Sequence, residues 1–388
     1  MLTPAPYSLR EITPGELPGF LKERDFKGIN VTIPYKEAVI PCLDSISDEA
    51  SAIGAVNTIV NKDGKLFGYN TDYFGLKYLV KSSGISPEGR KVLILGAGGA
   101  AKTAAALVRD IGASSVTHAV RDPRESGHVS IASLREENGF EIIINCTPVG
   151  MYPDNDGRLV ELNRFPMLKG VIDLVYNPLR TNLVLDAQEA GIPASGGLPM
   201  LVAQACRAHE LFHDSELPEG TIDCLCDRIL RDKRNIVLTG MPSSGKSTLG
   251  KMLAERTGRR HFDTDGLIVA ATGRSIPEIF EAEGESGFRR IEADIIYEAS
   301  RWNSAIISTG GGSVLDPGNV RHLRQNGLIC FIRRDIDKLT PSAGRPLAPD
   351  CEALAKLYEE RLGIYLRTAE RIIDNNGGLE EALTQFEI

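Results

Sequence analysis

The residues best suited to chemistry in this sequence form a glycine-rich loop between Arg234 and Thr248. The apolar run Ile236–Leu238 predicts a short buried strand, and Gly240, four further residues and Gly245-Lys246-Ser247 follow it. This spacing fits the phosphate-binding pattern G-x-x-x-x-G-K-[ST]. In that pattern backbone N–H groups face one anion, the lysine reaches the outer phosphates and the serine hydroxyl binds Mg²⁺. The strand before the loop and the helical spacing after it disfavour the alternative, an ordinary glycine- and serine-rich turn.

A second glycine-rich turn lies in the N-terminal half of the chain. Val92–Leu95 predicts a buried strand, and Gly96-Ala97-Gly98-Gly99-Ala100 then leads into an alanine-rich helix, which is a variant of the dinucleotide-binding fingerprint. The next expected strand, Ser115–Val120, ends at Arg121. An arginine there suits the 2′-phosphate of NADP, although Asp122 beside it weakens that argument. The pattern favours NADP over NAD.

Charged residues follow other expected strand ends. Lys36 comes after the β-branched run Ile29–Ile33, and Asp72 ends the stretch that begins at Gly68. Asp263 and Asp265 stand two residues apart, so that one can lie near the loop magnesium while the other faces an acceptor. Taken singly, such residues are usually solvated surface charges or acids at a helix start. They gain meaning only from the loops around them.

Two further stretches complete the candidate chemistry. Arg289 and Glu292 have helical spacing and could simply pair with each other. The expected strand Ile306–Ser308 ends in Gly310-Gly311-Gly312, a backbone nest suited to an anion or a hydroxyl-rich ligand.

The elements that position these residues alternate between strand and helix. Ile142–Asn145 and Val171–Val175 are further expected strands, and helices are expected over Glu16–Arg24, Gly196–Phe212 and Thr221–Lys233. This alternation predicts an α/β fold whose parallel sheets carry helices on both faces.

Composition limits the function classes. The 388 residues are 42% hydrophobic and 25% charged, which is typical of globular domains, and the length suits two or three of them. A net charge of −8 without long runs of one sign argues against nucleic acid as the main partner. No apolar run approaches the roughly 20 residues of a membrane span, and no signal pattern opens the chain. Seven scattered cysteines fit reduced thiols, so a cytoplasmic location is expected.

The N-terminal half resembles the shikimate dehydrogenases. The motifs that carry the resemblance occur in the family's order over roughly residues 7 to 212. They are Asn30–Lys36, Gly54–Thr58, Asn70–Asp72, Gly96–Ala100, Asn145–Met151 and Gly197–Gln204. The resemblance implies Lys36 and Asp72 as the catalytic pair at the substrate hydroxyl. Thr32, Asn57, Tyr176 and Gln204 would hold the cyclohexene acid, and Gly96 to Ala100, Arg121, Leu174 and Gly197 would hold NADP(H).

The remaining half resembles shikimate kinase over nearly its full length. The resemblance implies Asp265 as the base for the substrate 3-hydroxyl and Arg289 and Arg361 as the clamp on its carboxylate, with Phe280 and Gly311 lining the site. Ser247 and Asp263 would hold Mg²⁺, Lys246 would stabilise the transferring phosphoryl group, and Arg345 matches the lid arginine over ATP. The loop residues expected to bind ATP are Gly240, Ser243, Ser244, Gly245, Lys246, Ser247 and Thr248.

These resemblances predict a specific domain order. A dehydrogenase substrate domain is expected over residues 1–78, completed by a helix at 198–213, and a Rossmann NADP domain over 79–197. A linker helix is expected over 214–233 and a P-loop kinase domain of the nucleoside-monophosphate-kinase type over 234–388. The family's opening segment G-x-P-x-x-H-S-x-S-P has no counterpart before Tyr7, so the substrate domain is interpreted as N-terminally incomplete.

The resulting hypothesis is a fused enzyme of chorismate and aromatic amino acid biosynthesis. Its first half would reduce 3-dehydroshikimate with NADPH, and its second half would phosphorylate the shikimate formed, with ATP and Mg²⁺. Three alternatives stay open: an active kinase fused to a catalytically impaired dehydrogenase-like scaffold, a mis-set start codon, and a kinase for another small hydroxylated acceptor. Oligomeric state does not follow from the sequence.

Overall fold

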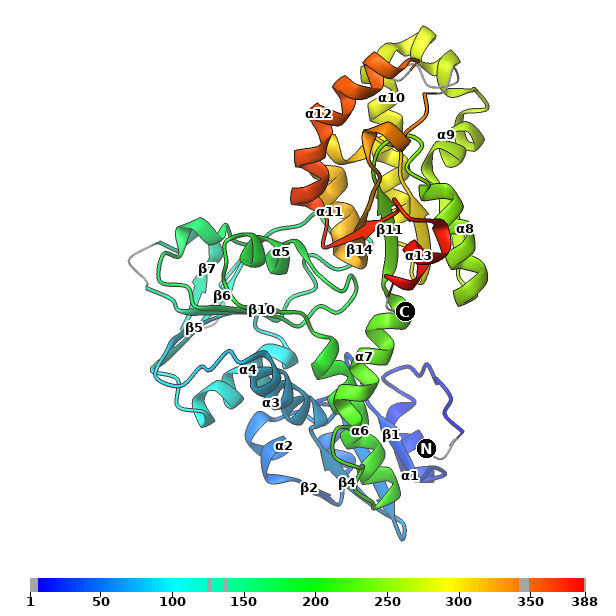
Figure 1. Ribbon diagram of the computed structural model, residues 1–388. Coiled ribbons are helices and arrows are strands. Elements are labelled where there is room, and N and C mark those ends of the chain that lie inside the picture. The colour runs from blue at the N-terminus through cyan, green and yellow to red at the C-terminus, as the bar shows by residue number, and fades with distance from the viewer. Residues whose placement is uncertain (1–5, 124–126, 136–138, 342–348, 387–388) are drawn as a thin grey trace. The chain divides into compact units, whose positions relative to one another are not determined.

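The structure is a computed structural model that describes residues 6–123, 127–135, 139–341 and 349–386 (Figure 1). The chain divides into two compact units. The first comprises Met1–Pro148, Leu159–Leu174 and Ala187–Leu225, and the second comprises Val149–Arg158, Val175–Asp186 and Cys226–Ile388.

The first unit begins with a small mixed sheet. In the described residues its strands run in the order β1-β3-β4-β2, namely β1 (Gly28–Asn30), β3 (Thr58–Lys62), β4 (Lys65–Tyr69) and β2 (Ser45–Ile46). β3 pairs antiparallel with both β1 and β4, while β2 pairs parallel with β4. Helices α1 (Leu17–Glu23) and α2 (Asp48–Ile53) and the 3₁₀ turn η1 (Ile40–Cys42) accompany it. Leu17, Leu21, Val56, Ile59 and Leu66 form its apolar core.

The first strand is shorter than expected. The predicted strand over Ile29–Ile33 is confirmed at Ile29 and Asn30 only, because β1 spans Gly28–Asn30 and the side chain of Ile33 is 83% exposed. Asn30 pairs with Thr58, the first residue of β3, and the Val31 N–H still donates to the Asn57 carbonyl at 2.7 Å before the two segments diverge. The segment that carries Lys36 is therefore a loop.

A second sheet of the first unit has six described strands, all parallel, in the order β10-β9-β8-β5-β6-β7. Starting from β7, this is the classic doubly wound order, and it places the topological switch point between β5 and β8. The strands are β5 (Lys91–Leu95), β6 (Ser115–Val120), β7 (His128–Ser130), β8 (Ile142–Asn145), β9 (Gly170–Asp173) and β10 (Ala194–Ser195).

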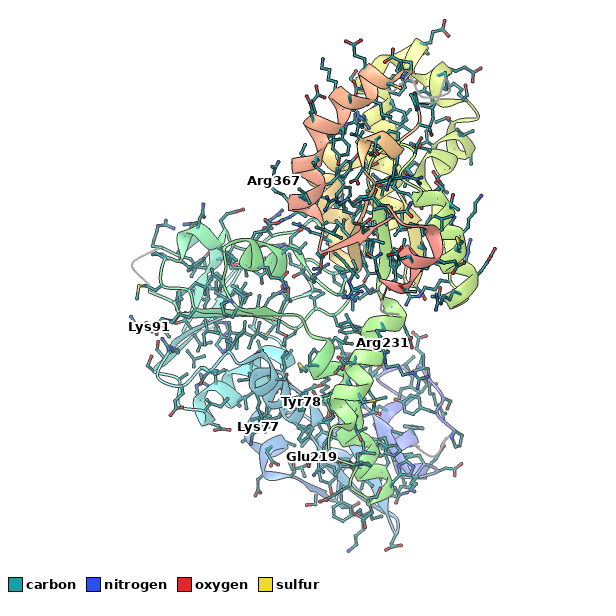
Figure 2. All side chains as sticks on the ribbon, viewed as in Figure 1. Lys77, Tyr78, Lys91, Glu219, Arg231 and Arg367 are labelled. Atoms are coloured by element: carbon teal, nitrogen blue, oxygen red, sulfur yellow. The ribbon has the colours of Figure 1, made fainter. Side chains whose placement is uncertain are left out.

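Helices of the first unit pack against this sheet and against one another. They are α3 (Thr71–Ser83), α4 (Gly99–Asp110) and α6 (Leu198–His213), with 3₁₀ turns η2 (Ile131–Ser133) and η4 (Leu162–Arg164). Helix α7 (Thr221–Lys233) begins in the first unit and continues into the second from Cys226. Ala101, Ala104 and Leu107 of α4 pack with Ile94 and Ile144 in the sheet core. Helix α3 runs beside α6 (Figure 1), and Tyr78 on α3 donates a hydrogen bond to Asp223 on α7 (Figure 2). Helix α5 (Asn182–Glu189) follows β9.

The second unit is built on a five-stranded parallel sheet. Its described order is β12-β13-β11-β14-β15, formed by β12 (Arg260–Asp263), β13 (Ala305–Ser308), β11 (Asn235–Thr239), β14 (Gly327–Arg333) and β15 (Arg371–Asp374). The helices are α8 (Lys246–Thr257), α9 (Thr264–Thr272), α10 (Ile276–Ser300), α11 (Pro317–Asn326), α12 (Cys351–Thr368) and α13 (Leu379–Thr384). The 3₁₀ turns η5 (Ser313–Leu315) and η6 (Ile336–Lys338) complete it.

Side chains alternate between the two faces of this sheet, and each face packs into a separate apolar core. Val237 faces a core shared with α10, α11 and α12, where Phe331 stacks on Tyr365 at 5.0 Å between ring centroids. Ile236 and Leu238 face the opposite core with α8 and α13. Because parallel strands covered on both faces are buried on both sides, they read as continuous apolar runs in the sequence.

Two short segments from earlier in the chain belong to the second unit through buried polar contacts. Asn155, Asn182 and Gln325 are all almost fully buried. The Asn155 amide donates to Gln325 Oε1 at 2.5 Å, and the Asn182 amide donates to the Asn155 carbonyl at 3.1 Å. Arg180 donates to both carboxylate oxygens of Glu370 at 2.8 and 3.0 Å. These satisfied groups give segments 149–158 and 175–186 a defined position within that unit.

Among the described residues, no helix combines the length and the apolar character needed to cross a membrane.

Candidate active sites

The first candidate site centres on an ion pair in the first unit. Asp72 lies in the first turn of α3, where the side chain of Asn70 caps the helix by accepting from the Tyr73 N–H. Lys36 reaches it from the loop after β1, and its Nζ lies 2.6 Å from Asp72 Oδ2. The side chains are 24% and 16% exposed. The pair is open enough to exchange a proton with a bound oxygen and enclosed enough to hold a fixed geometry.

Two predicted substrate residues meet beside this pair through Thr71. Asn57 Oδ1 accepts from the Thr71 N–H at 2.7 Å, and the Thr71 hydroxyl lies 3.4 Å from Gln204 Oε1. Gly75 makes this meeting possible, because a Cβ there would stand 2.6 Å from the carbonyl oxygen of Met200 on α6. Thr71 lies within the Asn70–Asp72 motif, but its connecting role was not predicted from the sequence.

The remaining predicted substrate residues are less enclosed. Thr32 is exposed in the loop after β1, and its carbonyl accepts from the Tyr35 N–H at 2.9 Å. Tyr176 belongs to the second unit and is 41% exposed.

The glycine-rich turn after β5 has the backbone that a dinucleotide needs. Gly96 adopts φ +112°, a conformation that favours glycine, and its carbonyl oxygen lies 3.1 Å from His118 Nδ1. Gly98 precedes α4 without any side-chain cap, which leaves the first N–H groups of the helix for an anionic ligand. Ala97 and Ala100 are partly buried in the same turn, and Gly99 is the first residue of α4.

Two predicted cofactor residues approach each other on the neighbouring strand ends. A Cβ on Gly197 would stand 2.2 Å from the carbonyl oxygen of Leu174, so only glycine fits there. Arg121 is exposed directly after β6, at the carboxyl edge shared with β5. Ligands of doubly wound sheets bind at this edge.

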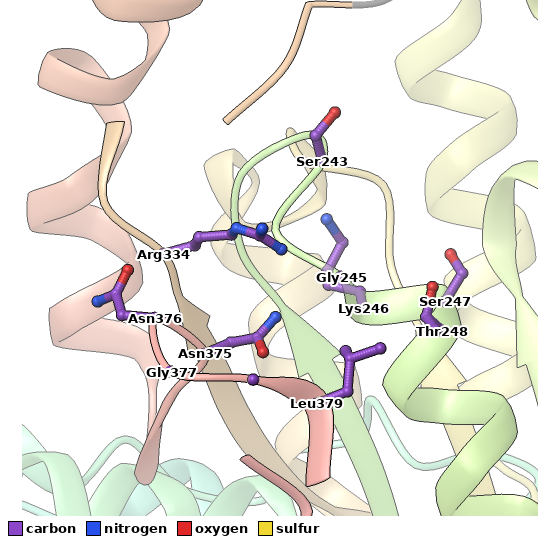
Figure 3. Close-up of a pocket in the computed structure, with 11 residues that line it drawn as sticks. Ser243, Gly245, Lys246, Ser247, Thr248, Arg334, Asn375, Asn376, Gly377 and Leu379 are labelled. Atoms are coloured by element: carbon purple, nitrogen blue, oxygen red, sulfur yellow. The ribbon is translucent and has the colours of Figure 1, made fainter. Parts of the chain in front are cut away.

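The second candidate site begins at the loop after β11. Positive φ values at Gly240 (143°), Ser243 (64°) and Gly245 (96°) turn the chain so that α8 starts directly at Lys246. Lys246 is almost buried, and its Nζ donates to the carbonyls of Gly240 and Met241 at 2.9 and 2.8 Å. The loop therefore holds the ammonium group in place at the start of the helix (Figure 3).

Ser247 and Asp263 lie together, as the predicted metal site requires. The Ser247 hydroxyl donates to Asp263 Oδ2 at 2.5 Å, and Asp263 Oδ1 accepts from the Asp265 N–H at 3.1 Å. The described residues contain no cluster of three or more metal-binding His, Cys, Asp or Glu side chains. A hydroxyl and one carboxylate nevertheless fit Mg²⁺, which usually keeps several waters and takes other ligands from phosphates.

One cavity of about 280 Å³ brings most of the predicted residues of the second site together. Its lining combines residues of the glycine-rich loop with acidic, cationic and aromatic side chains. The predicted residues that line it are Lys246, Ser247, Asp263, Asp265, Phe280, Arg289, Gly311 and Arg361.

Arg361 provides the clearest electrostatic feature of this cavity. It is only 5% exposed, and no ion pair joins it to a carboxylate among the residues that the structure describes. It hydrogen-bonds to Tyr365, whose hydroxyl donates to the Gly311 carbonyl. Burial raises the pKa of Tyr365 to about 12, so this hydroxyl keeps its proton at neutral pH. A buried guanidinium with no carboxylate partner among the described residues is suited to an anionic ligand.

Arg289 differs from Arg361 because carboxylates surround it. Its NH1 group donates to Glu292 Oε2 at 2.6 Å, and Glu292 Oε1 accepts from the Ser313 hydroxyl at 2.6 Å. Burial alone would lower the pKa of Arg289, but Glu292 and Glu285 outweigh it and raise that pKa. The guanidinium lies against Gly312, where a Cβ would stand 2.2 Å from NH2. Gly312 was predicted as part of a glycine nest, but its close approach to Arg289 was not predicted.

A neighbouring cavity of about 460 Å³ lies along the other side of the phosphate loop (Figure 3). Ser243, Gly245, Lys246, Ser247 and Thr248 line it, together with residues that were not predicted, among them the polar residues Arg334, Asn375 and Asn376. Asn375 donates to the carbonyl of the buried Ser244 at 2.8 Å. These residues follow β14 and β15, so strand order was the signal that could have found them. Arg345 lies outside the described residues.

Fold and sites together define two classes of enzyme: a dinucleotide-dependent oxidoreductase with a lysine–aspartate pair, and a P-loop phosphotransferase. The comparisons agree. Residues 3–59 match the model of the shikimate dehydrogenase substrate binding domain, and residues 242–387 match the model of shikimate kinase.

Curated relatives and solved structures extend the match over the first half. A shikimate dehydrogenase (NADP(+)) of Clostridium perfringens is 40% identical over 210 residues, covering 52% of this chain and 78% of the relative. That of Moorella thermoacetica is 34% identical over 261 residues, covering 62% and 87%. The crystal structure of a chorismate mutase/shikimate 5-dehydrogenase fusion protein from Clostridium acetobutylicum superposes with a TM-score of 0.53 at 31% identity, covering 57% and 84%. The chain belongs to the shikimate dehydrogenase family, and it also contains a shikimate kinase domain.

Proposed function

We propose that this chain catalyses two consecutive reactions on one metabolite. The first is the NADP(H)-dependent interconversion of 3-dehydroshikimate and shikimate, and the second is the ATP-dependent phosphorylation of shikimate at its 3-hydroxyl. Both reactions belong to the biosynthesis of chorismate and the aromatic amino acids. The observation that carries the proposal is the 2.6 Å contact of Lys36 with Asp72 in a chain whose separate cavity joins Asp265 to Lys246 and Arg361.

In the oxidoreductase site the chain's own residues handle the proton. NADP, when bound, supplies the hydride acceptor or donor. Lys36 gives or takes the proton of the substrate oxygen, while Asp72 orients the ammonium group. Asn57 and Gln204, which meet at Thr71, hold the ring hydroxyls. The uncapped start of α4 and the Gly96 turn hold the pyrophosphate.

In the phosphotransferase site the phosphate loop and two aspartates have different roles. Asp265 accepts the proton of the attacking hydroxyl, and Lys246 stabilises the negative charge on the transferring phosphoryl group. Ser247 and Asp263 would hold Mg²⁺, which neutralises phosphate charge. The two loop carbonyls that accept from Lys246 hold its ammonium group beside the start of α8.

The far side of the same cavity recognises the acid group of the substrate. Arg361 offers a buried guanidinium for a carboxylate, and Arg289 adds a second. Gly311 and Phe280 leave space for a small six-membered ring between these arginines and Asp265. This arrangement supports a small hydroxylated carboxylic acid as the acceptor.

The test is to measure both activities in one preparation of the 388-residue chain. Shikimate and NADP⁺ without ATP should yield NADPH, and shikimate with ATP and Mg²⁺ should yield shikimate 3-phosphate. Phosphorylation without any NADP⁺ reduction would make the first half a non-catalytic scaffold. Phosphorylation of another hydroxy acid in preference to shikimate would overturn the assignment of the acceptor.

A further inference from the structure

The guanidinium of Arg289 is shared between two carboxylates of different character. Glu292 is completely buried, accepts from NH1 at 2.6 Å and is fixed by the Ser313 hydroxyl. Glu285 is 50% exposed, and its Oε1 accepts from Nε at 3.3 Å and from NH2 at 3.1 Å. Glu292 is therefore a permanent partner, whereas Glu285 can turn into solvent.

Glu285 holds the part of Arg289 that a substrate carboxylate would use. A guanidinium offers parallel N–H pairs along two edges, and each pair matches the two oxygens of a carboxylate. Glu285 holds the edge formed by Nε and NH2, and Glu292 holds NH1 on the other edge. The face of the guanidinium lies against Gly312. An incoming carboxylate thus meets a guanidinium already shared by two anions.

The backbone presents Glu285 at this place. Helix α10 is interrupted at Gly284, which has φ 69° and ψ −175°, so Glu285 starts a new helical stretch and reaches Arg289 four residues later. Glu283, on the other side of the interruption, is held by Arg274 at 2.6 Å and Arg290 at 3.1 Å. The kink separates the two acids, and it leaves only Glu285 directed at the substrate-binding arginine.

We propose that Glu285 is an internal competitor for the carboxylate of the acceptor, and that it thereby sets the affinity of the phosphotransferase site. It occupies Arg289 in the free enzyme, yields to the substrate and returns as the product leaves. This inference rests on the proposed function, in which Arg289 receives the substrate carboxylate. Glu285 is a specificity-determining residue that acts through Arg289.

The experiment compares Glu285→Gln with Glu281→Gln in the full chain. Glu281 is an exposed acid on the same helix, so its substitution makes the same change in net charge. Because partly exposed pairs of this type are weak, we expect Glu285→Gln to lower the KM for shikimate by about two- to five-fold. The kcat of phosphorylation, the KM for ATP and the oxidoreductase KM for shikimate should not change. Glu281→Gln should leave the shikimate KM of the phosphotransferase unchanged.

The Arg289→Ala variant separates the proposed role of Glu285 from the proposed role of Arg289 in binding the substrate carboxylate. In Arg289→Ala the KM for shikimate should rise, and adding Glu285→Gln should then bring no gain. An unchanged or higher KM in Glu285→Gln, with Arg289→Ala still impaired, would overturn the competitor role and leave the carboxylate site intact. An unchanged KM in Arg289→Ala would overturn both. Thermal unfolding of each variant excludes a folding defect as the cause.

Discussion

The ammonium nitrogen of Lys36 lies 2.6 Å from a carboxylate oxygen of Asp72. The two residues come from a loop that lacks regular structure and from the first turn of α3, a rigid helix that packs on α6. The cap of α3 and the Asn57–Thr71 contact fix the acid, and the carbonyl of Lys36 accepts from the Val56 N–H at 2.8 Å, which anchors the backbone of the lysine. Both partners are therefore held, and the long side chain of Lys36 is the part that can follow a substrate oxygen as its bonding changes.

Lys36→Ala should abolish most of the oxidoreductase activity. A positioned acid–base group contributes about 10²- to 10⁴-fold, so kcat for NADP⁺ reduction by shikimate should fall within that range. Phosphorylation of shikimate by the same preparation should be unchanged. Lys65→Ala, which removes an exposed lysine of β4, is the matched control. Full reduction activity in Lys36→Ala would show that another group moves the proton.

Asp265→Asn should impair phosphorylation and leave the oxidoreductase activity intact. The amide keeps the size of the side chain but no longer accepts a proton, so phosphorylation should fall by about 10²- to 10⁴-fold while NADP⁺ reduction persists. Asp294→Asn, an exposed acid of α10, should change neither activity. Retention of phosphorylation in Asp265→Asn would leave Lys246 and Mg²⁺ as the main contributors.

Arg361→Lys should raise the KM for shikimate strongly. Lysine preserves the charge but loses the planar fork that binds a carboxylate through two N–H groups, and it also loses the contact with Tyr365. Loss of a buried charged hydrogen bond corresponds to about 10- to 100-fold in KM. Steady-state kinetics at saturating ATP measure it. An equal loss of affinity for ATP would point to general disruption of the cavity instead.

Local spacing was enough to predict the two glycine-rich loops. Gly240 to Ser247 and Gly96 to Ala100 could be found because each pattern lies within a few consecutive residues, and the structure places both at strand ends. Residues supplied by distant strands could not be found this way. Arg334 and Asn375 join the phosphate loop only because β14 and β15 lie on the same side of β11 in the sheet.

The burial of Arg361 and the length of the first strand could not be predicted from the sequence either. Arg361 in isolation looks like a solvated helix residue, and its burial depends on the packing of α12 against the triple-glycine segment. The expected strand over Ile29–Ile33 fails at Asn30 because its partner β3 begins at Thr58. Strand length is set by the neighbour as much as by β propensity.

Gly197→Ala should destabilise the first unit. The added methyl would meet the Leu174 carbonyl, and backbone cannot move aside as a flexible side chain can. Overpacking of this kind costs about 1–3 kcal/mol in the free energy of unfolding. Calorimetry should show a lower transition temperature. Steady-state kinetics should show a raised KM for NADP⁺. Gly98→Ala, where a Cβ meets open space, is the control for stability, and equal transitions for the two variants would contradict the steric argument.

His261 should make the stability of the second unit depend on pH. Burial lowers the pKa of this histidine below 6.5, its ring contacts the Ser308 hydroxyl at 2.9 Å, and Gly250 leaves room for it. Because the unfolded chain binds this proton more readily, the stabilisation is complete above about pH 6.5 and is lost as the pH falls below it. In His261→Gln the amide can keep the contact with Ser308 but does not titrate. The variant should therefore lose less stability between pH 7.5 and pH 5.5.

Trp302 provides the measurement for this prediction. It is the single tryptophan of the chain, and its ring lies 4.2 Å from that of Phe262, the neighbour of His261. Its fluorescence during thermal unfolding therefore reports the second unit. Phosphorylation activity at pH 7.5 controls for the fold of the variant. The same loss of transition temperature between pH 7.5 and pH 5.5 in both proteins would show that His261 does not carry the pH dependence.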